Sequence, residues 1–569
     1  MTTLAGEALV VVLAVMTLYL ALLVVIGWRA ARRTHGGEDF HLAGRSLGGW
    51  AAGISSTASS ESGWVTLGAV GMAYVHGVAG LWYAPGCLLG YLVNLFVVAP
   101  RLRRLSFEAG SITLTDVLAR RWGDPRHVLR ITATAIVVLC MLGYVAAQMT
   151  AAGKAFSTSL GPSLGLSDRA GYLLGVVVGA LVITLVTSLG GFRAVAWTDL
   201  FQGLLMAVAL LALPLYAVFR LGGFDQLVQG LGAIDPALLS ATGGMTGAVL
   251  LGFVIGNLGI GLGYPGMPHV VTRYMAARDD REVRRLQLVA ILWGVAVFYG
   301  AGLVGLAGRV LRPELADGEQ TLVVLALELT HPVIAGLLLA AVIAAILSTV
   351  SSQLLVAASA VSYDVVERAL GRASDDRRSL VLGRVTVAVV GLLGILVALT
   401  EVRLVFWFVL FAWAGLGAAF APLTLLALTR LPITRHGALA AMLTGVGVTV
   451  AWKLGRDAAS DPTTFSRVWW IVLVAAAAML LLGRLRQAFA VADRAAVIAA
   501  ALLTVLAWWL VQRWGLDGLY ELVPAFLLAT VAAFAVSLLL PDAEGSQRAT
   551  GPGAGQLRGG GVRPKESRT

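Results

Sequence analysis

The chain has 569 residues and a formal net charge of +11 at neutral pH; 58% of its residues are hydrophobic and only 13% are charged. A soluble globular domain carries about 25% charged residues, so this composition excludes a soluble globular protein and also a disordered one. The chain has only two cysteines, which excludes a disulfide scaffold, and both lie inside apolar stretches. We therefore expect a protein whose solvent is mostly lipid.

Fifteen apolar stretches are long enough to cross a bilayer as helices, which takes about 20 residues each. They cover residues 7–27, 46–72, 79–99, 127–152, 170–189, 195–219, 243–268, 286–311, 332–363, 380–400, 403–429, 436–455, 466–484, 494–513 and 519–540. They lack the alternation of period two that is typical of a β-barrel, so the sequence predicts an all-α polytopic membrane protein. The first stretch is expected to remain as a span, because no basic region precedes it as in a cleavable signal.

The basic residues are distributed unevenly between the two sides of this arrangement. With the N-terminus outside, 32 of the 42 Lys and Arg residues fall in segments that would face the cytoplasm. Such an excess is typical of cytoplasmic loops. We therefore expect a multi-pass protein of the cell membrane with its N-terminus outside and its C-terminus in the cytoplasm. Residues 541–569, rich in Gly and Arg, are expected to form a disordered tail.

Two of the stretches are interrupted in a matching way. The second contains the polar run 54–64, with Glu61 near its middle, and the seventh contains the Gly- and Pro-rich run 256–268. The seventh begins five stretches after the second, and such a pair is the sign of an inverted-repeat transporter with its binding site at the membrane midplane. Glycines alone would serve close helix packing, but the serines and Glu61 favour discontinuous helices.

Glu61 is a candidate functional residue, and so are Ser348 and Thr349, which are neighbours of each other in the sequence. An ionisable side chain inside a membrane usually faces a cavity or a partner; a protonated, hydrogen-bonded structural glutamate is the alternative. Hydroxyls in membrane helices commonly bond back to their own helix. However, hydroxyl oxygens together with the free carbonyls of unwound segments are also suitable ligands for a monovalent cation.

A series of separated motifs resembles the sodium:solute symporter family, and most closely its sodium/proline symporter branch. The motifs are residues 40–50 with 62–64, 143–147, 189–199, 261–264 with 268–269, 347–355, 412–420 and 518–524. They occur in the family's order, resembling its first, third, fifth, sixth, eighth and tenth core helices and its last span. The resemblance covers residues from about 38 to 540.

The resemblance implies a LeuT-type fold of two inverted five-helix repeats. The first repeat would occupy residues 46–219 and the second residues 243–429. An additional transmembrane helix and a cytoplasmic loop would precede them in residues 1–45, and further helices would follow in residues 436–540. Residues 456–513 resemble an insertion of two spans, which would preserve the sidedness of the chain after it.

The function implied by the resemblance is secondary active import of a small organic solute, such as the amino acid proline, by symport with a sodium ion through alternating access. The sodium ligands carried over are the carbonyls of Ala58, Glu61 and Ala345 and the hydroxyls of Ser348 and Thr349. The solute site is expected at Ser62, Gly63, Trp64, Tyr144, Ile260, Tyr264 and Pro268. Beyond the solute, the sodium ion and the bilayer, no nucleic-acid or protein partner is inferred.

Two positions differ from the proline branch. Ser60 stands where that branch has an aspartate important for high sodium affinity, and Ile260 stands where it has a tryptophan. The wall at Ile260 is thus apolar and non-aromatic, which changes the shape of the pocket relative to that branch.

Three alternatives accompany the prediction of a sodium symporter. Proton coupling through Glu61 would replace sodium in the same fold. A membrane sensor with a transporter-like fold would carry a C-terminal signalling domain, against which the short tail argues. An enzyme is not expected, because the sequence shows no metal-ligand spacing, phosphate-binding loop or dinucleotide motif.

Overall fold

The computed structural model of the chain describes residues 6–372, 375–399, 405–458, 491–514 and 519–541. Within these ranges every regular element is helical, apart from an isolated bridge between Leu47 and Ala277. Twelve segments of the described chain are long and apolar enough to cross a membrane as helices.

The long helices are α1 (Gly6–Ala31), α8 (Val128–Ser159), α9 (Asp168–Leu221), α13 (Asp280–Leu311), α15 (Pro332–Ser359), α16 (Asp376–Ala398), α17 (Val405–Ala427), α18 (Arg435–Ala458), α20 (Val491–Trp514) and α21 (Leu522–Leu539). The shorter ones are α2 (Gly37–Leu42), α3 (Gly49–Ser60), η2 (Trp64–Ala69), α4 (Val70–His76), η3 (Gly77–Trp82), α5 (Tyr83–Val93), η4 (Asn94–Val98), α6 (Ala99–Glu108), α7 (Leu114–Arg121), α10 (Phe224–Ile234), α11 (Gly247–Gly259), η7 (Ile260–Gly266), α12 (Pro268–Ala276), η8 (Gly318–Gln320), α14 (Thr321–Leu329) and η9 (Ala360–Ala369).

The predicted spans correspond to these helices, with a different count. The thirteenth, residues 466–484, lies outside the described residues. The fifth and sixth are the two arms of α9, and the third follows the end of the second without an intervening loop, in the continuous segment Trp64–Glu108. The fifteen predicted stretches therefore become twelve segments because two pairs are joined and one stretch is not described.

A single glycine separates the two arms of α9. Gly191 has φ 56° and ψ −147°, a conformation that side chains with a Cβ rarely adopt. A Cβ at this position would lie 2.6 Å from the ring and from the carbonyl oxygen of Phe40. The chain therefore changes direction there at the expense of one residue, which explains why the predicted loop between the two spans is absent.

Both predicted interruptions are present. α3 ends at Ser60, Glu61 leaves the helical conformation with φ −98° and ψ 51°, and the chain continues through a π-helical turn from Trp64. α11 gives way to the 3₁₀ turn η7, the extended residue Met267 follows, and Pro268 opens the half-helix α12. Proline suits the first position of a helix because a backbone N–H there would have no partner within the helix, so the missing N–H of proline costs nothing.

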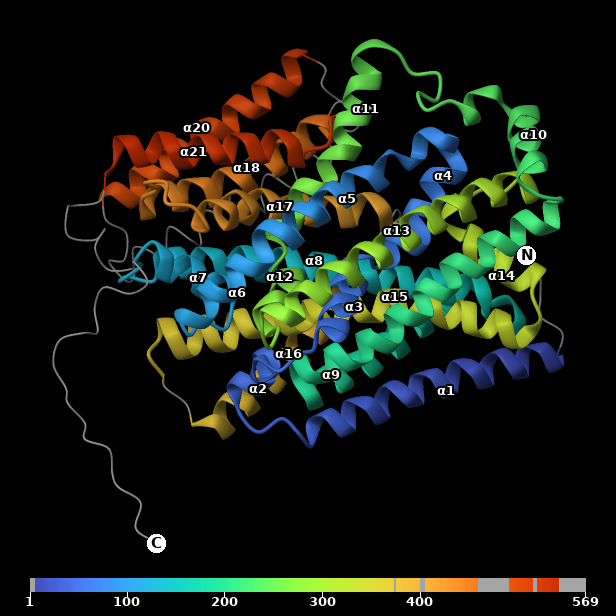
Figure 1. Cartoon of the computed structure of the whole chain (residues 1–569), viewed down its shortest axis with the longest axis horizontal. Helices are drawn as coiled ribbons and strands as arrows, with labels where there is room; N and C mark the ends of the chain where they lie inside the picture. The colour runs from blue at the N-terminus through green and yellow to red at the C-terminus, as the bar shows by residue number, and fades with distance from the viewer. Residues whose placement is uncertain (1–5, 373–374, 400–404, 459–490, 515–518, 542–569) are drawn as a thin grey trace, which may run out of the picture.

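The interrupted helices lie in the interior of the molecule. In Figure 1, α3 and α12 lie between α1 along one edge and α18, α20 and α21 along the opposite edge. α3 contacts α9, α12, α13 and α15, and η7 contacts α5 and α17. The long apolar helices thus shield both interruptions from the surroundings of the molecule.

Segments predicted to share a side of the membrane contact one another. On the side predicted to be cytoplasmic, Arg103 Nη1 lies 2.9 Å from Asp280 Oδ1, and Arg121 Nη2 donates to the carbonyl of Thr429 at 2.8 Å. On the other side, Lys154 Nζ lies 2.7 Å from Glu319 Oε2. Figure 1 shows α2, α6 and α7 at one end of the molecule and α10 at the other. The grouping agrees with the predicted order of crossings, whereas the orientation of the termini stays a prediction.

We expect Gly191→Ala to lower the stability of the purified protein by at least about 2 kcal/mol, because the new Cβ meets Phe40 and opposes the backbone conformation. The measurement is the melting temperature in detergent. Gly179→Ala in the same helix is the control, since its Cβ would make only ordinary contacts at 3.7 Å. Equal melting temperatures of the two variants would contradict the role assigned to Gly191.

Candidate functional site

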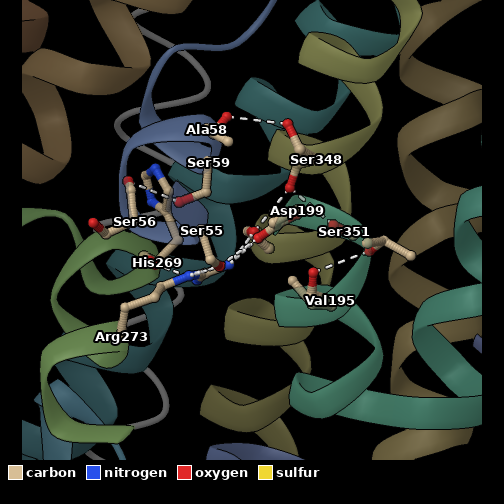
Figure 2. Close-up of polar contacts among 12 residues, drawn as sticks. Ser55, Ser56, Ala58, Ser59, Val195, Asp199, His269, Arg273, Ser348 and Ser351 are labelled. Carbon is tan, nitrogen blue, oxygen red and sulfur yellow. Dashed lines mark hydrogen bonds and ion pairs between the residues drawn. The ribbon is translucent and has the colours of Figure 1, made fainter. Parts of the chain in front are cut away.

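The end of α3 and the middle of α15 meet through oxygen atoms. Ser348 Oγ lies 3.0 Å from the carbonyl oxygen of Ala58 and 3.1 Å from that of Ala345, and Thr349 Oγ1 lies 3.2 Å from the latter. Figure 2 shows the contact between Ala58 and Ser348. All four residues are fully buried. The structure thus brings together four of the five predicted sodium ligands, and the fifth, Glu61, follows at the end of the same helix.

This arrangement goes beyond ordinary back-bonding. The contacts of Ser348 and Thr349 with Ala345 lie within one helix, as hydroxyls in membrane helices usually do. The contact with Ala58 instead joins two helices from different parts of the chain. Carbonyl and hydroxyl oxygens are the ligands that hard cations prefer. The cluster can therefore offer several oxygens to one small cation between α3 and α15.

The Glu61 carboxylate joins the two interrupted segments. Its Oε1 accepts hydrogen bonds from the hydroxyls of Tyr91 at 2.7 Å and Tyr264 at 2.9 Å, and from Ser60 at 3.0 Å. The side chain is fully buried, and its Oε2 has no hydrogen-bond partner among the described residues. The hydrogen bonds from three hydroxyls are what a structural glutamate would make. The Oε2 atom, in contrast, is available to a proton or another ligand.

Beside Glu61 lies a small space that we name the aromatic hollow. It is lined by Ser60, Trp64, Tyr144, Ile260, Tyr264, Val409, Leu410 and Trp413. Four of these were predicted as solute contacts, namely Trp64, Tyr144, Ile260 and Tyr264. None of the eight lining side chains is charged. The lining is therefore mostly apolar and aromatic, which is the kind of surface that small-molecule sites have.

The other three predicted solute residues, Ser62, Gly63 and Pro268, do not line the aromatic hollow. Ser62 Oγ accepts from the backbone N–H of Trp64 at 3.1 Å, and the Gly63 N–H donates to Gln148 Oε1 at 2.9 Å. Pro268 lines a second small space, the inner hollow, near the side predicted to be cytoplasmic. Direct contact of these three with a solute stays a prediction.

Trp413 is the main residue of the hollow that the sequence analysis left without a role. Its ring centroid lies 4.9 Å from that of Tyr264, and its Nε1 donates to the carbonyl of Ile260 at 3.1 Å. An aromatic ring with a polar atom, flanked by small residues in an apolar span, is the signal that could have identified it.

A buried ion pair lies next to the oxygen cluster. Arg273 Nη2 and Asp199 Oδ2 are 3.0 Å apart, and both side chains are fully inaccessible. Ser55 Oγ donates to Asp199 at 2.6 Å and accepts from Arg273 Nε at 3.0 Å, and Arg273 also contacts Ser352. Figure 2 shows Arg273 reaching from α12 toward Asp199. The pair thus ties α3, α9, α12 and α15 together, and a carboxylate inside a span was its signal in the sequence.

Comparison with known proteins confirms the resemblance indicated by the motifs. The family model described as Sodium:solute symporter family matches residues 40–445. The High-affinity proline transporter PutP of Bacillus subtilis is 34% identical over 435 residues, which are 76% of this chain and 89% of that protein. The Sodium/proline symporter of Staphylococcus aureus is 34% identical over 443 residues, which are 76% of this chain and 84% of that protein.

Solved structures confirm the predicted fold class. A Na⁺-coupled sialic acid symporter in a substrate-bound outward-open state has a TM-score of 0.66 at 19% identity and covers 93% of this chain and 98% of its own. Mhp1, a nucleobase-cation-symport-1 family transporter in a closed conformation, has a TM-score of 0.52 at 15% identity. The match covers 90% of this chain and 98% of the Mhp1 chain. The similarity to these LeuT-type structures concerns the fold.

We expect Glu61→Gln to leave the protein in the membrane and to change the ion dependence or the rate of uptake at least several-fold. The neutral amide keeps the size of the side chain but accepts weaker hydrogen bonds from the three hydroxyls than a carboxylate does. The measurement is uptake at varied sodium concentration and pH. Glu328→Gln, which alters an ion pair with Arg312 away from the hollow, serves as the control. Unchanged uptake in Glu61→Gln would support a structural carboxylate.

Proposed function

Because the chain belongs to the sodium:solute symporter family, we propose that it imports a small amino acid, such as proline or a related compound, together with sodium. The proposal is carried by one observation: the oxygen cluster between α3 and α15 lies beside the interruption whose residues Ser60 and Trp64 line the aromatic hollow. A cation and a solute can thus bind to neighbouring parts of the same interrupted helix. The N-terminus would lie outside and the C-terminus in the cytoplasm.

In the proposed mechanism, sodium is held by the carbonyls of Ala58, Glu61 and Ala345 and the hydroxyls of Ser348 and Thr349. These groups belong to α3 and α15, so a bound ion would hold the two helices together and fix the end of α3. Fixing α3 also fixes Ser60 and Trp64 at the hollow. The two binding events are then coupled, and each ligand raises the affinity for the other.

The ion gradient can drive accumulation of the solute. The membrane potential contributes about 2.3 kcal/mol per charge at 100 mV. A tenfold sodium gradient adds about 1.4 kcal/mol. Their sum, about 3.7 kcal/mol for one ion per solute, sustains roughly a several-hundredfold concentration ratio.

A proline-like solute is the class of solute that the relatives indicate, and the walls of the hollow are aliphatic and aromatic. The bacterial relatives named above are proline transporters. In this chain the side chain of Ile260 forms an aliphatic wall of the hollow. The ring of Trp413, from α17, lies beside Ile260, because its Nε1 donates a hydrogen bond to the Ile260 carbonyl. The shape of the pocket therefore depends on a pair of residues from two helices.

Proton coupling is the second candidate, favoured by the free Oε2 of the Glu61 carboxylate. The deciding experiment is uptake by proteoliposomes containing the purified protein. Labelled amino acids, carboxylates and sugars are offered under an imposed sodium gradient or an imposed proton gradient. Uptake of an amino acid that requires sodium supports the proposal; uptake that follows the proton gradient without sodium supports the alternative.

We expect Ser348→Ala and Thr349→Ala each to raise the sodium concentration for half-maximal uptake at least several-fold, because a cation stripped of water loses one ligand. Thr349→Ser keeps the hydroxyl and should be milder. The measurement is the sodium dependence of uptake at normal expression. Ser362→Ala is the matched control, since Ser362 is equally buried but bonds only to the carbonyl of Ala358 in its own helix. Normal sodium dependence in both alanine variants would remove this sodium site.

We expect Ile260→Trp and Tyr264→Ala to change the selectivity or apparent affinity for solutes, because both side chains line the aromatic hollow. A second indole at position 260 narrows the space beside Trp413 and should shift preference among amino acids of different size. The measurement is competition by unlabelled amino acids against the best transported solute. If neither substitution has an effect, the solute binds elsewhere.

A further inference from the structure

Two residues of the aromatic hollow, Ser60 and Tyr264, are hydrogen-bonded to the same carboxyl oxygen. Ser60 ends α3 and Tyr264 lies in η7, so the two interrupted segments meet at this oxygen. Glu61 Oε1 accepts from Tyr264 at 2.9 Å, from Ser60 at 3.0 Å and from Tyr91 at 2.7 Å, and all four side chains are buried. Sodium binding as proposed above uses only the backbone carbonyl of Glu61, so it does not account for this carboxyl group.

The hydroxyl protons of Ser60 and Tyr264 are directed to acceptors within the protein. Tyr264 donates its proton to Glu61. The proton of Ser60 can go to Glu61 Oε1 or to the carbonyl of Thr57 at 2.9 Å. Ser60 Oγ also lies 3.1 Å from Tyr91 Oη, whose own proton is donated to Glu61. A hydroxyl that has donated its only proton can still accept, so both oxygens offer a further partner lone pairs and no proton.

This acceptor character is the same for both protonation states of Glu61. A proton on its Oε2 atom, which has no hydrogen-bond partner among the described residues, would leave Oε1 as an acceptor. An ionised carboxyl group would bind the two hydroxyl protons more strongly, because hydrogen bonds to a charged acceptor are stronger. In either case the protons of Ser60 and Tyr264 stay with the protein.

A third polar group of the hollow is also engaged. Trp413 Nε1 donates to the carbonyl of Ile260 at 3.1 Å, so this N–H is not available to a solute. An ether or carboxylate oxygen of a solute therefore finds no proton at Ser60, Tyr264 or Trp413. An N–H group of a solute finds two acceptors. Because a buried polar group without a partner is costly, this difference favours solutes that donate hydrogen bonds.

We propose that Ser60 and Tyr264 accept hydrogen bonds from the protonated amine of the solute, and that the chain selects its solutes by this group. Glu61 is a positioning residue, since it holds the hydroxyl protons and leaves the lone pairs to the solute. Because the hollow is small, the solute enters as the lining rings move apart, while Ser60 and Tyr264 stay bound to Glu61. The inference rests on the proposed function and adds to it the recognised group, a primary or secondary amine.

The test changes the amine of a solute while its size is kept. Uptake of labelled L-proline and L-alanine is measured in proteoliposomes under an inward sodium gradient. The competitors are the unlabelled amino acids, propionate, which lacks the amine of alanine, and the ether analogue of proline, in which an oxygen atom replaces the ring N–H. The amine ratio is the inhibition constant of the analogue divided by that of its parent amino acid. For the better transported amino acid we expect a ratio of about ten to a hundred, the range for a hydrogen bond to a charged group.

Two variants remove the proposed acceptors one at a time. Tyr264→Phe removes a hydroxyl and keeps the ring, and Ser60→Ala removes the other hydroxyl. Each should lower the amine ratio about tenfold, mainly through a higher KM for the amino acid. The matched control is Tyr91→Phe, because Tyr91 is also buried and donates to the same oxygen of Glu61 but does not line the hollow. Its amine ratio should equal that of the wild type.

The variants must be folded for this comparison, which the melting temperature in detergent shows. If Tyr264→Phe does not fold, Ser60→Ala and the amine ratio of the wild type decide. An amine ratio near one in the wild type would overturn the proposal. So would an unchanged ratio in folded Tyr264→Phe and Ser60→Ala, or an equal fall of the ratio in Tyr91→Phe.

Failure of this inference can be distinguished from failure of the proposed function. In each of the overturning results above, sodium-driven uptake of an amino acid continues, so the proposed function stands while the role of Ser60 and Tyr264 falls. Absence of sodium-driven uptake of both amino acids, with uptake of simple carboxylates or sugars in its place, would contradict the proposed function and the inference together.

Discussion

A helix can be interrupted at membrane depth only where protein, and not lipid, surrounds the freed backbone groups. Both interruptions in this chain meet that condition. The residues from Ser55 to Trp64 are buried, α3 is enclosed by α9, α12, α13 and α15, and η7 is covered by α5 and α17. The oxygen cluster, the aromatic hollow and the buried ion pair all lie beside these two places. The surrounding helices thus keep lipid away from the two interruptions, and this allows the helices to be interrupted within the membrane.

The charge near the candidate sodium ligands is placed differently from the pattern of the proline branch. Ser60 occupies the position of that branch's aspartate and is one of the residues that line the aromatic hollow. The carboxylate of this chain, Glu61, lies behind it and is held by three hydroxyls, including that of Ser60 itself. The Glu61 side chain is therefore linked to the hollow through the hydroxyls of Tyr264 and Ser60, and not by direct contact.

The sequence predicted well those features that depend on local composition. The runs of Ser, Gly and Pro around residues 54–64 and 256–268 predicted both interruptions, because unusual backbone requires unusual residues. The turn inside α9 was not predicted, since Gly191 alone does not reveal its torsion angles to a reader of the sequence.

Features that depend on contact between distant spans could not be predicted from composition. Trp413 enters the hollow because α17 packs against η7, and Asp199 meets Arg273 because two arms of different helices converge on α3. Ser62 and Gly63 were expected in the solute pocket by their position in a motif. That expectation stays a prediction, and the structure adds that the Gly63 N–H donates to Gln148 of α8, a contact between distant parts of the chain. Such outcomes follow from packing geometry, which a one-dimensional pattern does not contain.

The glycine turn in α9 has a counterpart with consequences for how this chain tolerates change. Gly77, which ends α4, has φ 61° and ψ −140°, close to the angles of Gly191, and its Cβ would meet the backbone of Leu238. Loops usually absorb insertions and deletions, but the chain turns at Gly191 within one residue, and after Gly77 it turns through the short 3₁₀ helix η3. Added epitopes, reporter domains or protease sites would have no spare length to occupy there. Variation in chain length among related proteins should accordingly gather at other connections.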